Sequence, residues 1–160
     1  MSNVTAGATP LAELYQHVIQ EELGLVARID EEGDVLFRHP ELGTLYFSLS
    51  ADDPEFLRLV YPSFADATDL GMGRAELLEI INTVNNRCKA VKLYITQSSG
   101  DVVTNRVSAA IESFVAAPDA LPSEALLRGI VARCLSAIRH SAAETLREAG
   151  VLKPADESAH

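Results

Sequence analysis

Residues 25–61 have the sequence LVARIDEEGDVLFRHPELGTLYFSLSADDPEFLRLVY, and this stretch decides the fold class. Apolar and polar residues alternate within it, most clearly over 44–50, as they do in a strand with one buried face. Turn-forming residues interrupt the alternation at three places: 31–33, 39–43 and 52–54. Short strands joined by short turns predict an antiparallel meander of three or four strands, the last at 56–61 and ended by Pro62.

Helical and strand-like segments surround this meander. Apolar residues recur at helical spacing in three segments: 10–23, 74–88 and 124–149. Two more segments alternate as strands do, about 90–97 and 102–109, and the second of them could extend to Phe114. The predicted order is α-β-β-β(-β)-α-β-β-α, an α+β fold with an antiparallel sheet. It forms one expected domain over residues 9–150, with flexible tails at 1–8 and 151–160.

The composition argues against several classes of protein. Lys and Arg number 13 against 23 Asp and Glu, a net charge of −10, so phosphate groups would repel the surface. Nucleic acid and anionic membrane are therefore not expected partners. No segment is apolar over the roughly 20 residues of a transmembrane helix, and residues 1–9 lack the features of a secretory signal. Cys88 and Cys134 form no disulfide framework, so a soluble cytoplasmic protein is the expectation.

Signatures of catalysis, metal binding and cofactor binding are weak. The acidic clusters at 30–34 and 52–55 lack the spacing of a calcium loop, and the Gly71-x-Gly73 segment lacks the third glycine of a dinucleotide fingerprint. The histidines show no metal-ligand spacing, and no Gly-x-Ser-x-Gly segment follows a strand. The sequence therefore predicts no enzyme, no catalytic residue, no metal and no cofactor. A cryptic hydrolase or metal enzyme stays open as an alternative.

The second predicted helix carries asparagine at an unusual position. Its segment Ile81-Asn82-Thr83-Val84-Asn85 places Asn85 inside the apolar arc of the helix and Asn82 at the edge of that arc. Asparagine is unfavourable within a helix and costly to bury without hydrogen bonds. We expect the backbone of the sheet or of a neighbouring loop to satisfy Asn85. The alternative is that Asn85 belongs to a recognition site.

Ile81-Asn82 followed by Asn85 resembles the I-N-x-x-N signature of YbjN-like domains, and the order of elements over about 11–149 fits as well. The resemblance implies a fold similar to class I type III secretion chaperones, which are small acidic dimers that hold an extended client segment. It also implies a bacterial domain of a group labelled as sensory transduction regulators, with no catalytic residues. Asn82 and Asn85 are the signature positions, with an expected structural role. The chain departs from the pattern by an apparent extra strand within 44–61.

These observations favour a homodimer that binds an unknown protein partner as a chaperone, adaptor or regulator. The candidate partner-binding residues alternate onto strand faces that the helices cannot all cover: Tyr46, Leu57, Leu59 and Tyr61. The candidate dimer interface is an apolar stripe on the last helix: Val131, Leu135, Ile138 and Ala142. The alternative function is a small-ligand sensor in a bacterial regulatory pathway, which would need a concave pocket with converging polar groups.

Overall fold

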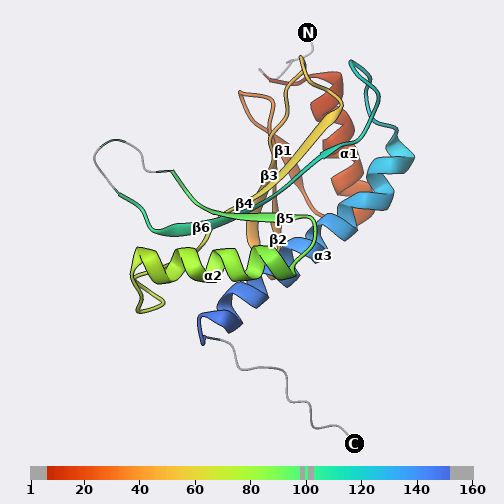
Figure 1. Ribbon diagram of the computed structural model, residues 1–160. Helices are drawn as coiled ribbons and strands as arrows, with labels where there is room; N and C mark the ends of the chain where they lie inside the picture. Colours follow the sequence, from red (N-terminus) through yellow and green to blue (C-terminus); the bar gives the residue numbers. More distant parts are fainter. Residues whose placement is uncertain (1–6, 98–99, 101–102, 152–160) are drawn as a thin grey trace, which may run out of the picture. The chain divides into compact units, whose positions relative to one another are not determined.

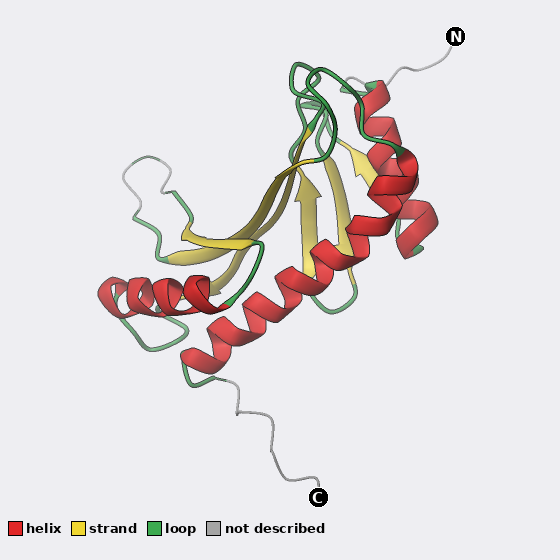
Figure 2. Cartoon of the chain, turned by 45° about the vertical axis from the view of Figure 1, so that its right-hand side comes forward, coloured by secondary structure: helices red, strands yellow, loops and turns green. Residues whose placement is uncertain are grey.

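The computed structural model describes residues 7–97, 100 and 103–151, and most of the two predicted tails lies outside these residues (Figure 1). The elements in chain order are α1 (Pro10–Leu23), β1 (Ala27–Ile29), β2 (Val35–His39), β3 (Gly43–Phe47), β4 (Phe56–Asp66), α2 (Arg74–Arg87), β5 (Val91–Ile95), β6 (Arg106–Phe114) and α3 (Glu124–Glu148). The strands form one six-stranded antiparallel sheet with the order β1-β2-β3-β4-β6-β5. Figure 2 shows the strands in yellow and the helices in red. The predicted α+β class and element order are thereby confirmed.

The chain divides into two compact units. The first comprises Met1–Tyr61 and Ala110–Ser136, and the second comprises Pro62–Ala109 and Ala137–His160. Because the division falls within β4, within β6 and within α3, each of these three elements contributes residues to both units. In the described part of the chain, no helix is both long and apolar enough to span a bilayer.

Helix α1 begins and ends at the residues that the sequence indicates. The Thr9 hydroxyl accepts a hydrogen bond from the backbone N–H of Ala12 at 3.1 Å, and Pro10 occupies the first helical position. Gly24 ends the helix in the left-handed region, at φ 64°, and its N–H donates to the carbonyl of Gln20. The buried side of α1 supplies apolar side chains to the core of the first unit: Leu11, Ala12, Tyr15, Val18 and Ile19.

The core of the first unit lies on one face of the sheet. Alternate residues of β2, β3 and β4 are buried there: Val35, Phe37, Leu45, Phe47, Leu57 and Leu59. The ring of Phe47 lies 4.9 Å from that of Tyr15 and 6.0 Å from that of Phe37, measured between centroids. Aromatic rings at these separations add stabilisation beyond the area that they bury. The sheet register places Tyr46 opposite Val60, on the other face.

The predicted end of the fourth strand at Pro62 is wrong, because β4 continues to Asp66. Proline has no N–H to give to the ladder, and Ser63 adopts a positive φ of 46°, which is unusual for a residue with a side chain. The Ser63 N–H donates to the hydroxyl of Ser108 on β6, at 2.8 Å, instead of to a carbonyl. A side chain therefore carries the pairing past the proline. The last strand begins later than predicted, since β6 covers Arg106–Phe114, but its end agrees with the extension to Phe114 that the sequence allowed. Residue 102, where the predicted strand begins, lies outside the described residues.

Helix α2 and strand β5 are neighbours in the second unit (Figure 1). The buried side of α2 consists of Leu77, Ile81 and Val84, which agrees with the apolar stripe expected from the sequence. At the end of α2, the guanidinium of Arg87 lies 2.7 Å from the carboxylate of Glu148 on α3. Both side chains are substantially exposed, so this ion pair adds little to stability.

Candidate functional site

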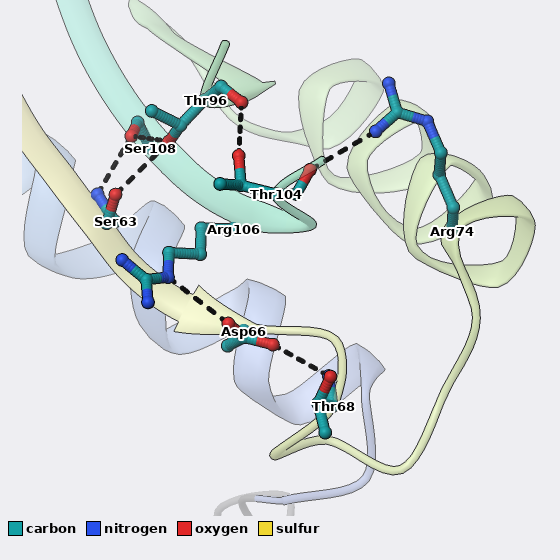
Figure 3. A network of polar contacts seen from close by, with 8 residues as sticks. All are labelled: Ser63, Asp66, Thr68, Arg74, Thr96, Thr104, Arg106 and Ser108. Carbon is teal, nitrogen blue, oxygen red and sulfur yellow. Dashed lines mark hydrogen bonds and ion pairs between the residues drawn. The ribbon is translucent and has the colours of Figure 1, made fainter. Parts of the chain in front are cut away.

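A network of hydroxyl groups lies where β4, β5 and β6 meet in the second unit (Figure 3). The buried Ser108 hydroxyl lies 2.6 Å from that of Thr96 and also accepts the Ser63 N–H. The Ser63 hydroxyl lies 3.3 Å from the Thr96 hydroxyl, and Thr104 donates to the Thr96 carbonyl at 2.9 Å. The network ties Ser63, the residue after Pro62, to β6 through the Ser108 hydroxyl.

Charged side chains border this network (Figure 3). Arg106 donates to the carboxylate of Asp66 at 3.3 Å, and Arg74 donates to the carbonyl of Thr104 at 3.4 Å. The backbone N–H of Thr68 donates to Asp66 at 2.9 Å, and together with Arg106 it lowers the pKa of that carboxyl. The charged groups of Asp66, Arg74 and Arg106 therefore all bond to neighbouring loops or strand ends.

The hydroxyl network does not form a nucleophile–base pair among the described residues. The side chains of Ser63, Thr96 and Ser108 bond to one another and to backbone groups, while Asp66 is occupied by Arg106 and Thr68. An activated serine needs a base within hydrogen-bonding distance. The geometry therefore fits a structural role.

Asn85 has the backbone partner that the sequence predicts. Its amide nitrogen donates to the carbonyl of Leu93 at 3.1 Å, and its amide oxygen accepts the N–H of Leu93 at 2.9 Å. The carboxamide thus engages both polar groups of one residue of β5. Asn82 is exposed on the same helix, and its carbonyl accepts a hydrogen bond from the side chain of Asn86 at 2.7 Å.

The four candidate partner-binding residues do not share one surface. Leu57 and Leu59 are 0% exposed and belong to the core of the first unit, so neither offers a side chain to a partner. Tyr61 is half-buried, donates its hydroxyl to the Leu42 carbonyl at 2.8 Å, and has its pKa raised by burial. Tyr46 is half-buried on the opposite face of the sheet.

The candidate dimer residues on α3 are buried within the chain itself. They are all nearly inaccessible: Val131, Leu135, Ile138 and Ala142. The apolar stripe that suggested an interface is instead the side of α3 that is buried within the protein. A dimer that used these residues would have to expose the core, so the α3 interface expected from the sequence does not fit this burial.

An exposed aromatic pair lies on β4 and β6, in the first unit. Phe114 is 78% exposed, and its ring meets that of Phe56 edge-on, with centroids 5.6 Å apart. Two residues further along the same strands, Arg58 pairs with Glu112 at 3.1 Å. Both pairs lie on the face that also carries Tyr46, opposite the buried face with Leu57 and Leu59. We call Phe56, Phe114 and Tyr46 the outer-face aromatics.

Carboxylates gather beside Phe56 and Phe114. The Phe56 N–H donates to the carbonyl of Asp53, and the side chain of Glu55 accepts the N–H of Asp119 at 3.3 Å. The pKa of Asp53 is raised, first by reduced hydration and then by the charges of Glu55 and Asp119. This surface is therefore apolar at its centre and negatively charged at one side. No sequence signal identified this surface, because period-two alternation does not show which face of a strand stays exposed.

No cation site accompanies these carboxylates. Among the described residues, no group of three or more His, Cys, Asp or Glu side chains has a geometry that could hold a metal ion. Cys88 and Cys134 are free thiols, and burial raises the pKa of Cys134, which disfavours the reactive thiolate.

A surface hollow lies at the β1–β2 turn in the described part of the chain. It is lined by Arg28, Ile29 and the acidic residues 30–32, and it opens widely to solvent. Ligand pockets are usually enclosed and mostly apolar. The hollow is open rather than enclosed, so it does not favour the sensor alternative.

The comparisons with known proteins do not assign the chain to a family. No family model, curated protein or solved structure gives a significant match to it.

Proposed function

We propose that this protein is a YbjN-like, non-enzymatic module that binds another protein and acts as a chaperone, adaptor or regulator. One observation carries the proposal: Phe114 is 78% exposed on a sheet face, in ring contact with Phe56. Exposed aromatic side chains grouped on a rigid element are characteristic of protein interfaces, where they anchor the partner. Strands β4 and β6 fix the positions of both rings.

The surroundings indicate the chemistry of the partner. Asp53, Glu55 and Asp119 lie beside the aromatic pair, and the whole chain carries a charge of −10. Their mutual repulsion would be relieved by a cationic group from a partner. An arginine of the partner can also stack over the exposed Phe114 ring. The partner in this proposal is a protein segment that combines apolar residues with Arg or Lys.

Selection from a displayed peptide library, followed by titration of the selected peptides, tests the proposal. We expect peptides that combine basic and apolar residues, with an affinity that falls as salt rises. Phe114→Ser should weaken binding by at least about tenfold, which corresponds to the loss of a hot-spot side chain. Val26→Ser is the matched control, because Val26 is 86% exposed in the first unit but lies on the β1 side of the sheet.

Two outcomes would overturn the proposal. The first is an affinity of Phe114→Ser equal to that of the unmodified protein. The second is a selected set of peptides without basic residues. Phe114→Ser leaves the core intact since the ring is largely in solvent, so misfolding does not complicate the result.

The homodimer and the cytoplasmic location form the remaining part of the proposal. The free thiols of Cys88 and Cys134 suit a reducing compartment. A dimer would need a surface other than the buried stripe on α3 and, so that the partner can bind at the same time, other than the surface around Phe114. Sedimentation velocity of the purified protein tests this, and a monomer at every concentration would contradict it.

A further inference from the structure

Strand β5 forms one edge of the sheet, with β6 as its single neighbour. The unpaired N–H and C=O groups of an edge strand can pair with a strand of another chain. Just after β5, the N–H of Thr96 donates to the carbonyl of Arg106 on the β6 side, at 2.8 Å. The backbone N–H and C=O groups of successive strand residues point to opposite sides. Since those of Thr96 point toward β6, the backbone groups that point away from β6 are those of Val91, Leu93 and Ile95.

The central residue of that open edge is already occupied. Asn85 accepts the Leu93 N–H at 2.9 Å and donates to the Leu93 carbonyl at 3.1 Å. In an antiparallel sheet, two opposed residues exchange the same pair of hydrogen bonds. The carboxamide of Asn85 therefore imitates one residue of a neighbouring strand, and we call this contact the edge clamp.

The opposite edge of the sheet has a related contact. On β1, the carbonyl of Ala27 accepts from the side chain of Gln16 at 2.9 Å, and its N–H approaches the side-chain oxygen of Gln20 at 3.5 Å. The N–H of Asp30 donates to Asp34 on the β2 side, so Ala27 faces away from β2. Helix carboxamides thus engage an outward-facing residue at each edge, two of them at Ala27 in the first unit and one at Leu93 in the second.

We propose that Asn85 guards a latent interaction edge: it keeps β5 from pairing with β5 of a second copy of this chain. The second copy is the occupant that the geometry favours, since two Leu93 residues related by a twofold axis would exchange the two hydrogen bonds that Asn85 supplies within one chain. The edge clamp acts whether or not Phe114 binds a partner, because it involves different residues in the other unit.

Replacing Asn85 by alanine tests the edge clamp. In Asn85→Ala, the Leu93 amide should exchange with solvent about tenfold to a hundredfold faster, since its acceptor is gone. The variant should also associate with rising concentration beyond the state of the unmodified protein. Amide exchange followed by NMR and sedimentation velocity measure the two effects. Asn82→Ala is the matched control, an exposed asparagine on the same helix, and it should change neither.

A second variant keeps the test decisive if Asn85→Ala folds poorly. Asn85→Asp retains an acceptor for the Leu93 N–H, but it loses the donor and places a negative charge on the edge. The Leu93 amide should stay slow in this variant, and no additional association should appear. Unchanged exchange of Leu93 in a folded Asn85→Ala would overturn the clamp, and faster exchange without association would overturn the role of the second copy.

Discussion

The continuation of β4 past Pro62 depends on the hydroxyl of Ser108, and Ser108→Ala measures that dependence. The substitution removes two hydrogen bonds, to the Ser63 N–H and to the Thr96 hydroxyl. Each contributes about 1 kcal/mol to the free energy of unfolding. Against this, the substitution removes a polar group that folding must dehydrate. Losing this desolvation cost adds up to about 1 kcal/mol to the free energy of unfolding. The expected net loss is therefore about 1–2 kcal/mol.

Urea unfolding followed by circular dichroism measures this loss. A chain of this size loses about 2–4 °C in melting temperature per kcal/mol, so a decrease of about 2–8 °C should accompany it. Ser113→Ala is the matched control, since Ser113 is an exposed serine on the same strand, and its effect should stay within about 0.5 kcal/mol. The amide of Ser63 should also exchange faster in Ser108→Ala. A loss no larger than that of Ser113→Ala would refute the idea that the hydroxyl replaces the missing ladder bond.

Three further predictions concern α1 and its end. The Tyr15 hydroxyl is buried and has no hydrogen-bond partner among the described residues. Replacing Tyr15 by Phe removes this unsatisfied group, so Tyr15→Phe should raise the free energy of unfolding, measured in urea, by about 1 kcal/mol. A loss of stability would contradict this. Burial raises the pKa of Tyr15 above its ordinary value, so above about pH 10 the unfolded chain releases the proton first and stability falls with rising pH; Tyr15→Phe should make that fall shallower. Gly24 has φ 64°, a left-handed conformation that strains a residue with a side chain. Gly24→Ala should therefore lower the free energy of unfolding by about 1 kcal/mol, which thermal denaturation measures as a lower melting temperature. An unchanged melting temperature would argue against strain at this position.

Local sequence signals predicted the elements whose causes are local. The cap Thr9-Pro10 and the terminator Gly24 define α1, and the structure places its ends there. The alternation over 44–50 and the turns beside it predicted the meander, including the extra strand that made it four. The apolar stripe of α2 was likewise correct, because it depends only on helical spacing.

The errors arise where a cause lies far away in the sequence. Pro62 normally ends a strand, and the residue that lets β4 continue is Ser108, which lies 45 positions after its partner Ser63. Leu57 and Leu59 are both fully buried, on the face where Tyr15 of α1 packs against Phe47, whereas Phe114 beside Phe56 on the other face is exposed. Helical spacing likewise defines the apolar stripe of α3 but not what covers it, so this buried stripe was interpreted as an interface. Periodicity separates two faces of an element, and only packing decides which of them meets solvent.

Asn85 shows how far a sequence argument can reach in such a case. An asparagine within the apolar arc of a helix requires a partner, and this necessity follows from the cost of burying an unpaired amide. The identity of the partner does not follow, since it depends on Leu93 being at an outward-facing position of an edge strand, which the strand order sets. Ser108 and Gln16 have a similar role. The side chain of Ser108 bonds to Ser63 of β4, and that of Gln16 bonds to Ala27 of β1, so each supplies a hydrogen bond that the sheet ladder lacks there. A polar residue that is out of place in its own element is therefore best explained by an interruption in a neighbouring one.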